Sequence, residues 1–332
     1  MAPSTSTLGK SPSATNLEKR IAELSDSAVY AIAGASAGVI SGVVVCPLDV
    51  VKTKLQAQGG FSQHGIISEH YYNGLRGTIS TIWRTEGFKG FYRGVVPIVL
   101  GYLPTWMVYF TIYEEAKRLL GQNKVFQDHP SVAHIVAALC AGSASTTVTN
   151  PIWVVKTRLM TQSPHTSWHY SGTWDAFHQM FRKEGLGSFY AGLAPALLGL
   201  THVAVQFPLY EEFKSLLVPT PESNPSESHK VGGIILASSM SKMLASVATY
   251  PHEVIRTRMQ IQKGLPSNGI VRYKGIVHTF KVLLHEEGWR VFYSGLGTNL
   301  VRTVPASAVT LITYEVIVEH LTDIKKKQSV LE

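Results

Sequence analysis

Charged residues follow three prolines at a constant spacing, and their pattern suits ion pairing and anion binding. Behind Pro47, Pro151 and Pro251, the same offsets hold Asp49, Lys52, Lys54, Lys156, Arg158, Glu253, Arg256 and Arg258. An acid and a base three residues apart lie on one face of a helix. Such charges are costly inside an apolar segment unless they are paired or in water. The pattern therefore indicates paired charges beside a polar cavity, although Trp153 stands where the second copy would carry its acid.

The sequence contains no motif that is typical of an enzyme. There is no Ser/His/Asp set, no metal-binding cluster and no glycine-rich phosphate loop, so we expect no enzymatic activity, no metal and no cofactor. The net charge of +8 favours anionic partners. Nucleic acid is not expected, because no run of Lys and Arg with interleaved aromatic residues follows a groove. The two cysteines, Cys46 and Cys140, form no CxxC pair and predict neither a disulfide framework nor a zinc site.

A second block of residues shows that the chain is three copies of one unit. Tyr72, Tyr170 and Tyr273 each precede a Glu-Gly pair by fourteen residues, and an aromatic pair and a glycine follow at fixed offsets. A fixed internal period of about one hundred residues defines the architecture before any local pattern does. Apolar residues at helical spacing before each Glu-Gly pair predict one short amphipathic helix per repeat.

Long helices must position these motifs. The first has about 20 mostly apolar residues before Pro47, which is enough to cross a bilayer. Prolines inside helices kink them, so we expect bends at Pro47, Pro151 and Pro251. Gly34, Gly38 and Gly42 form a small-residue ridge that permits close helix packing. The expected long helices cover about 27–58, 95–120, 131–162, 194–217, 230–262 and 296–321.

The chain divides into three repeats and two tails. The Ser-, Thr- and Pro-rich start predicts a disordered tail. A transit peptide is the alternative, but the few basic residues follow no amphipathic pattern, which favours an uncleaved tail. The predicted divisions are the tail 1–26, the repeats 27–122, 131–218 and 230–322, and the tail 323–332.

Three registered proline motifs with three Glu-Gly blocks resemble the mitochondrial carrier family over about residues 27–322. The resemblance implies an all-α membrane protein with six transmembrane helices in three pseudo-symmetric repeats, each with a short matrix-side amphipathic helix. It also implies the inner mitochondrial membrane and contact with cardiolipin, and we expect a monomer. Basic residues cluster in the three long connections, which we expect to face the matrix, with both termini towards the intermembrane space.

The same resemblance implies charge networks at both ends of a central cavity. On the matrix side, the acid of one repeat pairs with the base of the next. Asp49 would pair with Lys156 and Glu253 with Lys52, while Trp153 leaves Arg256 without a partner. Gln56 and Gln260, at the ends of the motifs, are assigned to this matrix gate. The alternative is that these charges form static salt bridges.

The cytoplasmic network is expected at the ends of the even helices. The resemblance pairs Glu114 with Lys214 and Glu315 with Lys117. Val318 replaces the third base and leaves Glu211 without a partner. Each gate would therefore hold two of three pairs, which suits a gate that must open, because each buried pair carries a desolvation cost.

Substrate contacts are expected midway along the even helices. The resemblance places them at Gly101 and Tyr102, at Gly199 and Leu200, and at Arg302. A guanidinium offers a bidentate grip on phosphate. Tyr102 and Trp106 could stack on a base or serve only in packing.

Two further residues carry open alternatives. Lys242 stands where the other repeats have Gly38 and Gly142, and it lies about 20° around a regular helix from Glu253. It could bind a phosphate in the cavity or extend to the membrane interface. His202 could line the cavity or pack as an ordinary histidine.

The stretch around Trp153 resembles the branch of the family that carries NAD, FAD, folate and pyrimidine nucleotides. The segment 199–204 is most similar to the mitochondrial NAD carriers of fungi. We therefore expect NAD import or exchange with nucleotides by alternating access, with NAD as the transported substrate. A pyrimidine-nucleotide or FAD/folate carrier is the alternative within transport. A soluble helical-repeat scaffold is the alternative from another class, although such scaffolds repeat every 20–50 residues.

Overall fold

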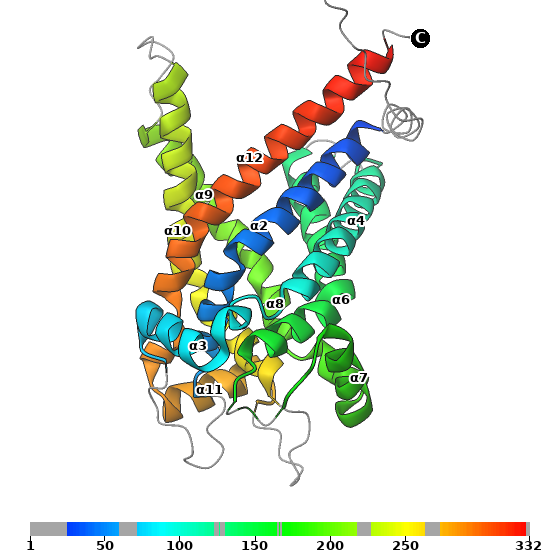
Figure 1. The fold of residues 1–332 in the computed structure, drawn as a ribbon. Helices are drawn as coiled ribbons and strands as arrows, with labels where there is room; N and C mark the ends of the chain where they lie inside the picture. The colour runs from blue at the N-terminus through cyan, green and yellow to red at the C-terminus, as the bar shows by residue number, and fades with distance from the viewer. Residues whose placement is uncertain are drawn as a thin grey trace, which may run out of the picture.

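The chain folds into long and short helices that alternate in the same order three times (Figure 1). This computed structural model describes residues 25–59, 72–122, 126, 130–164, 166, 168–217, 227–262 and 273–329. Residues 1–24 of the expected N-terminal tail lie outside these ranges, whereas Ser25 and Asp26 cap and begin the first helix. The helices are α2 (Asp26–Ala57), α3 (Gly74–Gly90), α4 (Val95–Leu120), α6 (Pro130–Thr161), α7 (Thr173–Glu184), η1 (Leu186–Tyr190), α8 (Leu193–Leu198), η2 (Gly199–Thr201), α9 (His202–Leu217), α10 (Glu227–Ile261), α11 (Ile276–Glu286), η4 (Trp289–Tyr293) and α12 (Leu296–Ser329).

The three repeats close into a ring. α4 packs against α6, α9 against α10, and α12 against α2, so the third repeat contacts the first. The short helices α3, α7 and α11 lie together at one end of the bundle, which we call the closed end (Figure 1). The start of α2 and the end of α12 lie at the opposite end, where α10 and α12 diverge. α12 continues past the predicted repeat boundary at residue 322 to Ser329.

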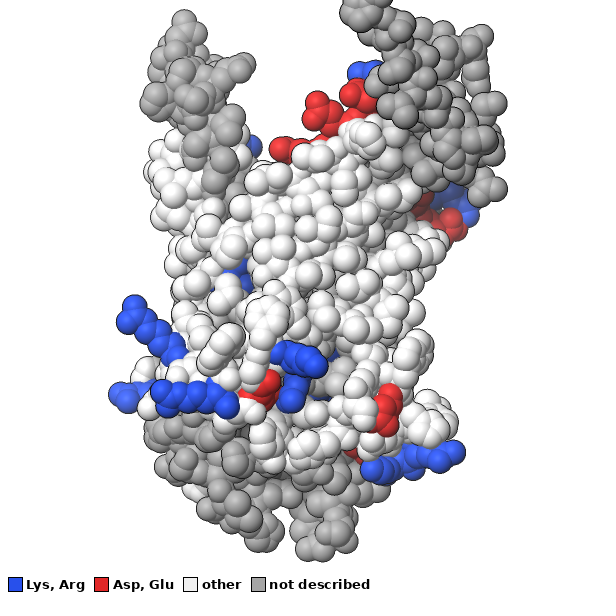
Figure 2. Space-filling view, viewed as in Figure 1, with Lys and Arg blue, Asp and Glu red and all other residues white. Residues whose placement is uncertain are grey.

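Five of the described helical stretches are long and apolar enough to cross a membrane: Ala28–Ala57, Val95–Leu120, Val132–Thr161, Leu186–Leu217 and Trp289–Lys326. Between the charged groups near the two ends, Figure 2 shows a broad band of mostly uncharged surface, interrupted by one small basic patch. α10 is 35 residues long but less apolar, because Ser238, Ser239, Ser241 and Lys242 occupy its middle. That α10 is the sixth span stays a prediction.

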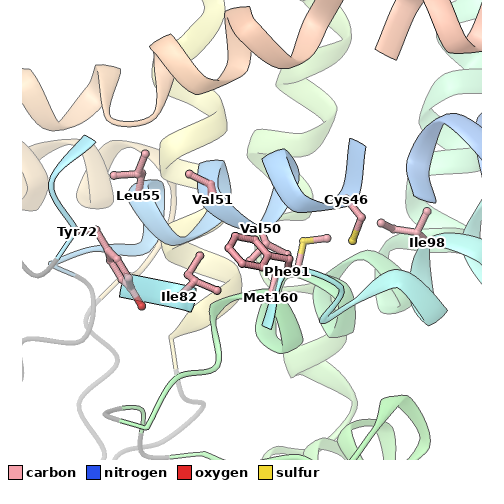
Figure 3. Packing of buried hydrophobic residues seen from close by; sticks show 9 residues of the cluster. All are labelled: Cys46, Val50, Val51, Leu55, Tyr72, Ile82, Phe91, Ile98 and Met160. Atoms are coloured by element: carbon pink, nitrogen blue, oxygen red, sulfur yellow. The ribbon is translucent and has the colours of Figure 1, made fainter. Parts of the chain in front are cut away.

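Three small hydrophobic clusters repeat at equivalent positions beside the closed end. In the first repeat, Val50, Val51 and Leu55 of α2 pack with Ile82 of α3 (Figure 3). Met160 of α6 joins the same cluster and links the first repeat to the second. The equivalent clusters contain Val154, Val155 and Met180, and Ile255, Leu283 and Phe292. Each cluster fixes a short helix against the end of the long helix that carries the charged motif.

A glycine with left-handed backbone begins the second long helix of each repeat. Gly94, Gly192 and Gly295 have φ values of 88°, 75° and 82°. A Cβ atom on each would lie 3.0–3.2 Å from the carbonyl oxygen of Lys156, Arg256 or Lys52 of the next repeat. Glycine adopts positive φ at little cost and leaves room for that close approach. These contacts hold the motif helices of neighbouring repeats together at the closed end.

Two elements differ in detail from the sequence expectations. The ridge of Gly34, Gly38 and Gly42 faces large side chains of α4, including Tyr102 and Ile98, rather than another small-residue ridge. The predicted helix 194–217 is interrupted, because Gly199–Thr201 forms the 3₁₀ turn η2 between α8 and α9. The turn brings Gly199 against His252, whose Nε2 would lie 2.7 Å from a Cβ at that position.

Candidate functional site

Two ion pairs join neighbouring repeats where the proline motifs converge. Lys156 Nζ lies 2.8 Å from Asp49 Oδ2, and Lys52 Nζ lies 2.5 Å from Glu253 Oε2. The prolines that precede these charges lie inside the continuous helices α2, α6 and α10. The residues that the sequence assigns to the matrix gate therefore meet in space. All four side chains are largely shielded from solvent, with Glu253 the most accessible at 31%.

Hydrogen bonds brace this layer from the closed end. Gln56 Nε2 contacts the Tyr250 hydroxyl at 3.0 Å and Glu253 Oε2 at 3.5 Å. The Thr257 hydroxyl donates to Gln56 Oε1 at 2.9 Å. Gln260 has the equivalent contact in the second repeat, where its Oε1 accepts from Thr157 at 2.7 Å. Gln56 and Gln260 thus tie α2 to α10 and α6 to α10 just below the ion pairs.

Arg302 of α12 adds a contact that the sequence did not predict. Its Nη1 lies 3.1 Å from Asp49 Oδ1, while Lys156 occupies the other carboxylate oxygen. Arg302 Nη2 contacts Asn299 Oδ1 at 3.3 Å, and its buried Nε has no hydrogen-bond partner. Arg302, which we expect to contact the substrate, therefore also binds Asp49, the acid of the ion pair with Lys156. No sequence spacing relates α12 to α2, so this contact required the three-dimensional structure.

A cavity of about 470 Å³ lies above the ion pairs. Tyr102, Gly199, Leu200 and Arg302 line it, as expected for substrate contacts. Gly101 is buried behind this wall, and a Cβ there would lie 3.2 Å from Ile152. The charged side chains around the cavity are Asp49, Lys52, Lys156, Glu253, Arg256 and Arg302. This volume is within the range of small-molecule sites.

Trp153 forms an aromatic wall with Tyr102. The two ring centroids are 5.8 Å apart with an edge-to-face angle of 89°. Lys156 Nζ lies 5.3 Å from the centre of the Trp153 ring, a cation–π arrangement. The indole Nε1 donates to Thr149 Oγ1 at 3.1 Å. Trp153 therefore does more than remove an acid, because it presents a fixed ring surface to the cavity.

Besides Gly101, three expected site residues do not line this cavity. Trp106 stacks on Phe110 with a centroid distance of 5.4 Å and lies against Gly34, which favours the packing alternative. His202 Nδ1 is 3.0 Å from the Thr249 hydroxyl, a contact between α9 and α10. Lys242 Nζ is 3.4 Å from Ser307 Oγ on α12. It lies eleven residues before Glu253, or about 16 Å along the helix.

The charges expected at the cytoplasmic gate are not paired in this conformation. Across the described ranges, no ion pair joins Glu114, Lys117, Glu211, Lys214 or Glu315 to another residue. Glu114, Lys117, Glu211 and Glu315 are exposed. Lys214 Nζ lies 5.7 Å from the Tyr210 ring centre. Ion pairs thus hold one end of the molecule together while the opposite charges stand apart.

A second charge layer escaped sequence analysis. The later base of each motif binds the Glu of its own repeat's Glu-Gly pair. Lys54 lies 2.7 Å from Glu86, Arg158 holds Glu184 through two contacts of 2.5 and 2.7 Å, and Arg258 holds Glu287 through contacts of 2.9 and 2.7 Å. The same bases donate to backbone carbonyls of Gln162, Gln260 and Gln56 in the next repeat. The strict recurrence of both partners in the sequence was the available signal.

Comparison with known proteins places this geometry in a family. The family model "Mitochondrial carrier protein" matches residues 25–124, 127–220 and 227–325. The chain is 49% identical over 313 residues to mitochondrial nicotinamide adenine dinucleotide transporter 1 of Saccharomyces cerevisiae, covering 93% of this chain and 82% of the relative. It is 37% identical to the mitochondrial nicotinamide adenine dinucleotide transporter 2 of Arabidopsis thaliana, covering 90% and 80%. Folate transporter 1, chloroplastic, of the same plant is 36% identical, covering 88% and 94%.

Proposed function

The chain belongs to the mitochondrial carrier family, and on that premise we propose that it transports NAD across a membrane by alternating access. The observation that carries the proposal is the composition of the cavity. Cationic side chains at its floor suit phosphate, and the Tyr102–Trp153 wall suits a flat ring. NAD joins two ring systems through a pyrophosphate. The relatives named as NAD transporters support this choice over folate.

Within the proposed cycle, Arg302 binds substrate phosphate. Its unpartnered Nε and its place in the cavity wall favour this role. Tyr102, Gly199 and Leu200 contact the rings. Gly101 has no side chain, which leaves room for Ile152 and Trp153 to pack against α4. Lys242 and His202 lie outside the described cavity lining, so we assign them to contacts nearer the opposite end, met before the substrate reaches the floor. Trp106 supports the wall by packing on α2.

The two charge networks act as gates. We assign Asp49, Lys52, Lys156 and Glu253 to the matrix gate, with Gln56 and Gln260 bracing it. Glu114, Lys117, Lys214, Glu315 and the unmatched Glu211 form the cytoplasmic gate in the other conformation. Opening either gate separates buried charge pairs, and the substrate supplies replacement contacts for some of them. The static alternative is that the pairs never separate.

The proposed setting is the inner mitochondrial membrane. The closed end with α3, α7 and α11 faces the matrix, and both termini face the intermembrane space. Anionic lipid, cardiolipin in this membrane, surrounds a monomer. The basic net charge supports an anionic surrounding and an anionic solute.

The test is uptake of labelled NAD by purified protein in liposomes loaded with candidate counter-substrates. We expect saturable NAD uptake that unlabelled NAD competes away. Nicotinamide riboside, which lacks phosphate, should compete poorly. Arg302→Ala should weaken uptake about tenfold or more, because one charge-assisted contact is lost. Stronger transport of a pyrimidine triphosphate, FAD or folate than of NAD would move the substrate to that alternative.

A further inference from the structure

The cavity floor has more positive charge than its own acids can balance. Four cationic side chains and two acidic side chains line it. Lys52 binds Glu253, while Lys156 and Arg302 share Asp49. Arg256 is the remaining cation, and no acid of the described residues lies within ion-pair distance of its guanidinium.

The residue that would balance Arg256 by repeat symmetry is replaced by an aromatic. Asp49 and Glu253 occupy the acidic position of the first and third motifs, and Trp153 occupies it in the second. Trp153 and Arg256 both line the cavity. The indole is held in place by Thr149 and by its edge contact with Tyr102. A bound molecule at this position therefore meets a ring surface beside an unbalanced guanidinium.

The Arg256 side chain is half-buried, and a charge shielded from solvent is destabilising unless something supplies the opposite charge. Here Trp153 stands in place of the missing carboxylate, and both Trp153 and Arg256 line the proposed substrate cavity. A guanidinium binds phosphate in a bidentate way that a lysine cannot reproduce. The partner that fits is thus an anionic group attached to an aromatic ring, which is the chemistry of a nucleotide.

We propose that Arg256 is a specificity-determining residue that binds a substrate phosphate, with Trp153 as the adjoining ring contact. This inference deepens the proposed transport of a nucleotide and rests on it. It gives the second phosphate contact to Arg256, which lines the same cavity as Arg302, rather than to Lys242, which lies about four turns earlier on α10. Trp153, which stands at the acidic position of the second motif, then serves substrate recognition instead of gate pairing.

The experiment compares Arg256→Gln, Arg256→Lys and wild type in NAD uptake and in NAD-induced rise of Tm in detergent. Arg256→Gln should raise the KM for NAD about tenfold or more and abolish most of the NAD-induced Tm rise. Arg256→Lys should recover part of both, because the charge remains. Arg182→Gln is the matched control, since Arg182 is exposed on α7, away from the cavity. It should leave both measurements unchanged.

A second variant tests the same contact from its neighbour. Trp153→Asp restores an acid opposite Arg256, so it should reduce the NAD-induced Tm rise as Arg256→Gln does. The two changes should not be additive, because both remove one interaction. If Trp153→Asp instead raises the Tm without NAD and leaves the NAD-induced rise intact, the position acts only in the gate and the inference is wrong.

The outcomes separate this inference from the proposed function. Normal NAD uptake by wild type with an unchanged KM and Tm rise in Arg256→Gln overturns the role of Arg256 alone. If wild type responds to another nucleotide and not to NAD, the NAD assignment fails and Arg256 is judged by the response to that nucleotide. If no phosphate-bearing nucleotide, NAD included, raises the Tm of wild type, both are wrong.

Discussion

Asp49 connects the proposed matrix gate to the proposed substrate site. Its two carboxylate oxygens bind Lys156 of the second repeat and Arg302 of the third. A phosphate that draws Arg302 away removes one of two cations from this acid. The remaining pair with Lys156 then holds the junction between the first two repeats by itself. Substrate binding can thereby weaken one gate contact without touching the gate base.

Removing the Asp49 carboxylate should therefore impair transport more than the loss of a single exposed ion pair would. In Asp49→Ala, Lys156 and Arg302 both lose their carboxylate, and we expect uptake to fall about tenfold or more. Exchanging the charges at positions 49 and 156 should recover part of the activity. Recovery should be incomplete, because a lysine at position 49 would face Arg302. Liposome uptake measures all variants, and a double exchange no better than either single change would contradict the pairing.

The motifs and their resemblance to carriers were enough to predict two of the ion pairs. Asp49 with Lys156, and Glu253 with Lys52, follow from the repeat and its resemblance to carriers. The position of Arg302 beside Asp49 could not be predicted, since it depends on how α12 packs against α2. The neighbours of Lys242 could not be predicted either, because its helical angle does not show that its height along α10 places it beside Ser307; its phosphate contact stays a prediction.

The second charge layer, in which the later base of each motif binds the Glu of the Glu-Gly pair, holds the short helices against the long ones. Arg158 and Glu184 are almost fully buried, at 2% and 5% side-chain exposure. Arg258 is as deeply buried, but its partner Glu287 is 24% exposed. A buried charge that loses its partner is costly, whereas water can replace a partner near the surface. The layer is complete in all three repeats, unlike the gate above it.

Glu184→Gln should accordingly destabilise the protein more than Glu287→Gln. Breaking a well-buried pair costs about 3–5 kcal/mol, and we expect the loss at Glu287 to be smaller because water reaches it. The measurement is the Tm of each purified variant in detergent. Equal Tm losses would show that burial of the acid does not control the strength of these pairs.

The glycines at the starts of α4, α8 and α12 set how closely the repeats approach. In Gly192→Ala, a Cβ would lie 3.0 Å from the Arg256 carbonyl at a φ of 75°. A non-glycine residue in such a strained backbone costs on the order of 1–3 kcal/mol. Gly187→Ala is the control, because nothing lies within 4 Å of its Cβ position. The Tm should fall in the first variant and stay near wild type in the second.

Element boundaries were predictable because hydrophobic period, prolines and glycines agree over long stretches. The interruption at η2 was not, since 194–217 also contains Pro195 and Pro208, which lie inside α8 and α9, and the sequence does not show that the helix breaks at Gly199 instead. The turn forms where Gly199 meets His252 of the next repeat. Trp106 is likewise an aromatic residue that could stack on a base, and only its contacts with Phe110 and Gly34 favour the packing alternative.

In the molecule as a whole, the three repeats are held together by ion pairs at one end, and helices diverge at the other. Ion pairs connect the repeats beside α3, α7 and α11, whereas α10 and α12 diverge at the opposite end (Figure 1). Alternating access requires a second conformation in which this relation is reversed. The charges that we propose for this second conformation lie on α4, α9 and α12. A ring of three similar repeats allows each to move in the same way.

Neutralising the bases of the open end should slow transport without destabilising the present conformation. In the double variant Lys117→Gln with Lys214→Gln, neither Glu315 nor Glu114 has its proposed partner in the reversed state. We expect exchange to fall several-fold, by roughly 1 kcal/mol or more if both pairs contribute. The Tm in detergent should barely change, because neither lysine forms an ion pair among the described residues here. Unchanged exchange at equal protein levels would mean that these charges do not pair during the cycle, and a large Tm loss would mean that they stabilise the conformation seen here.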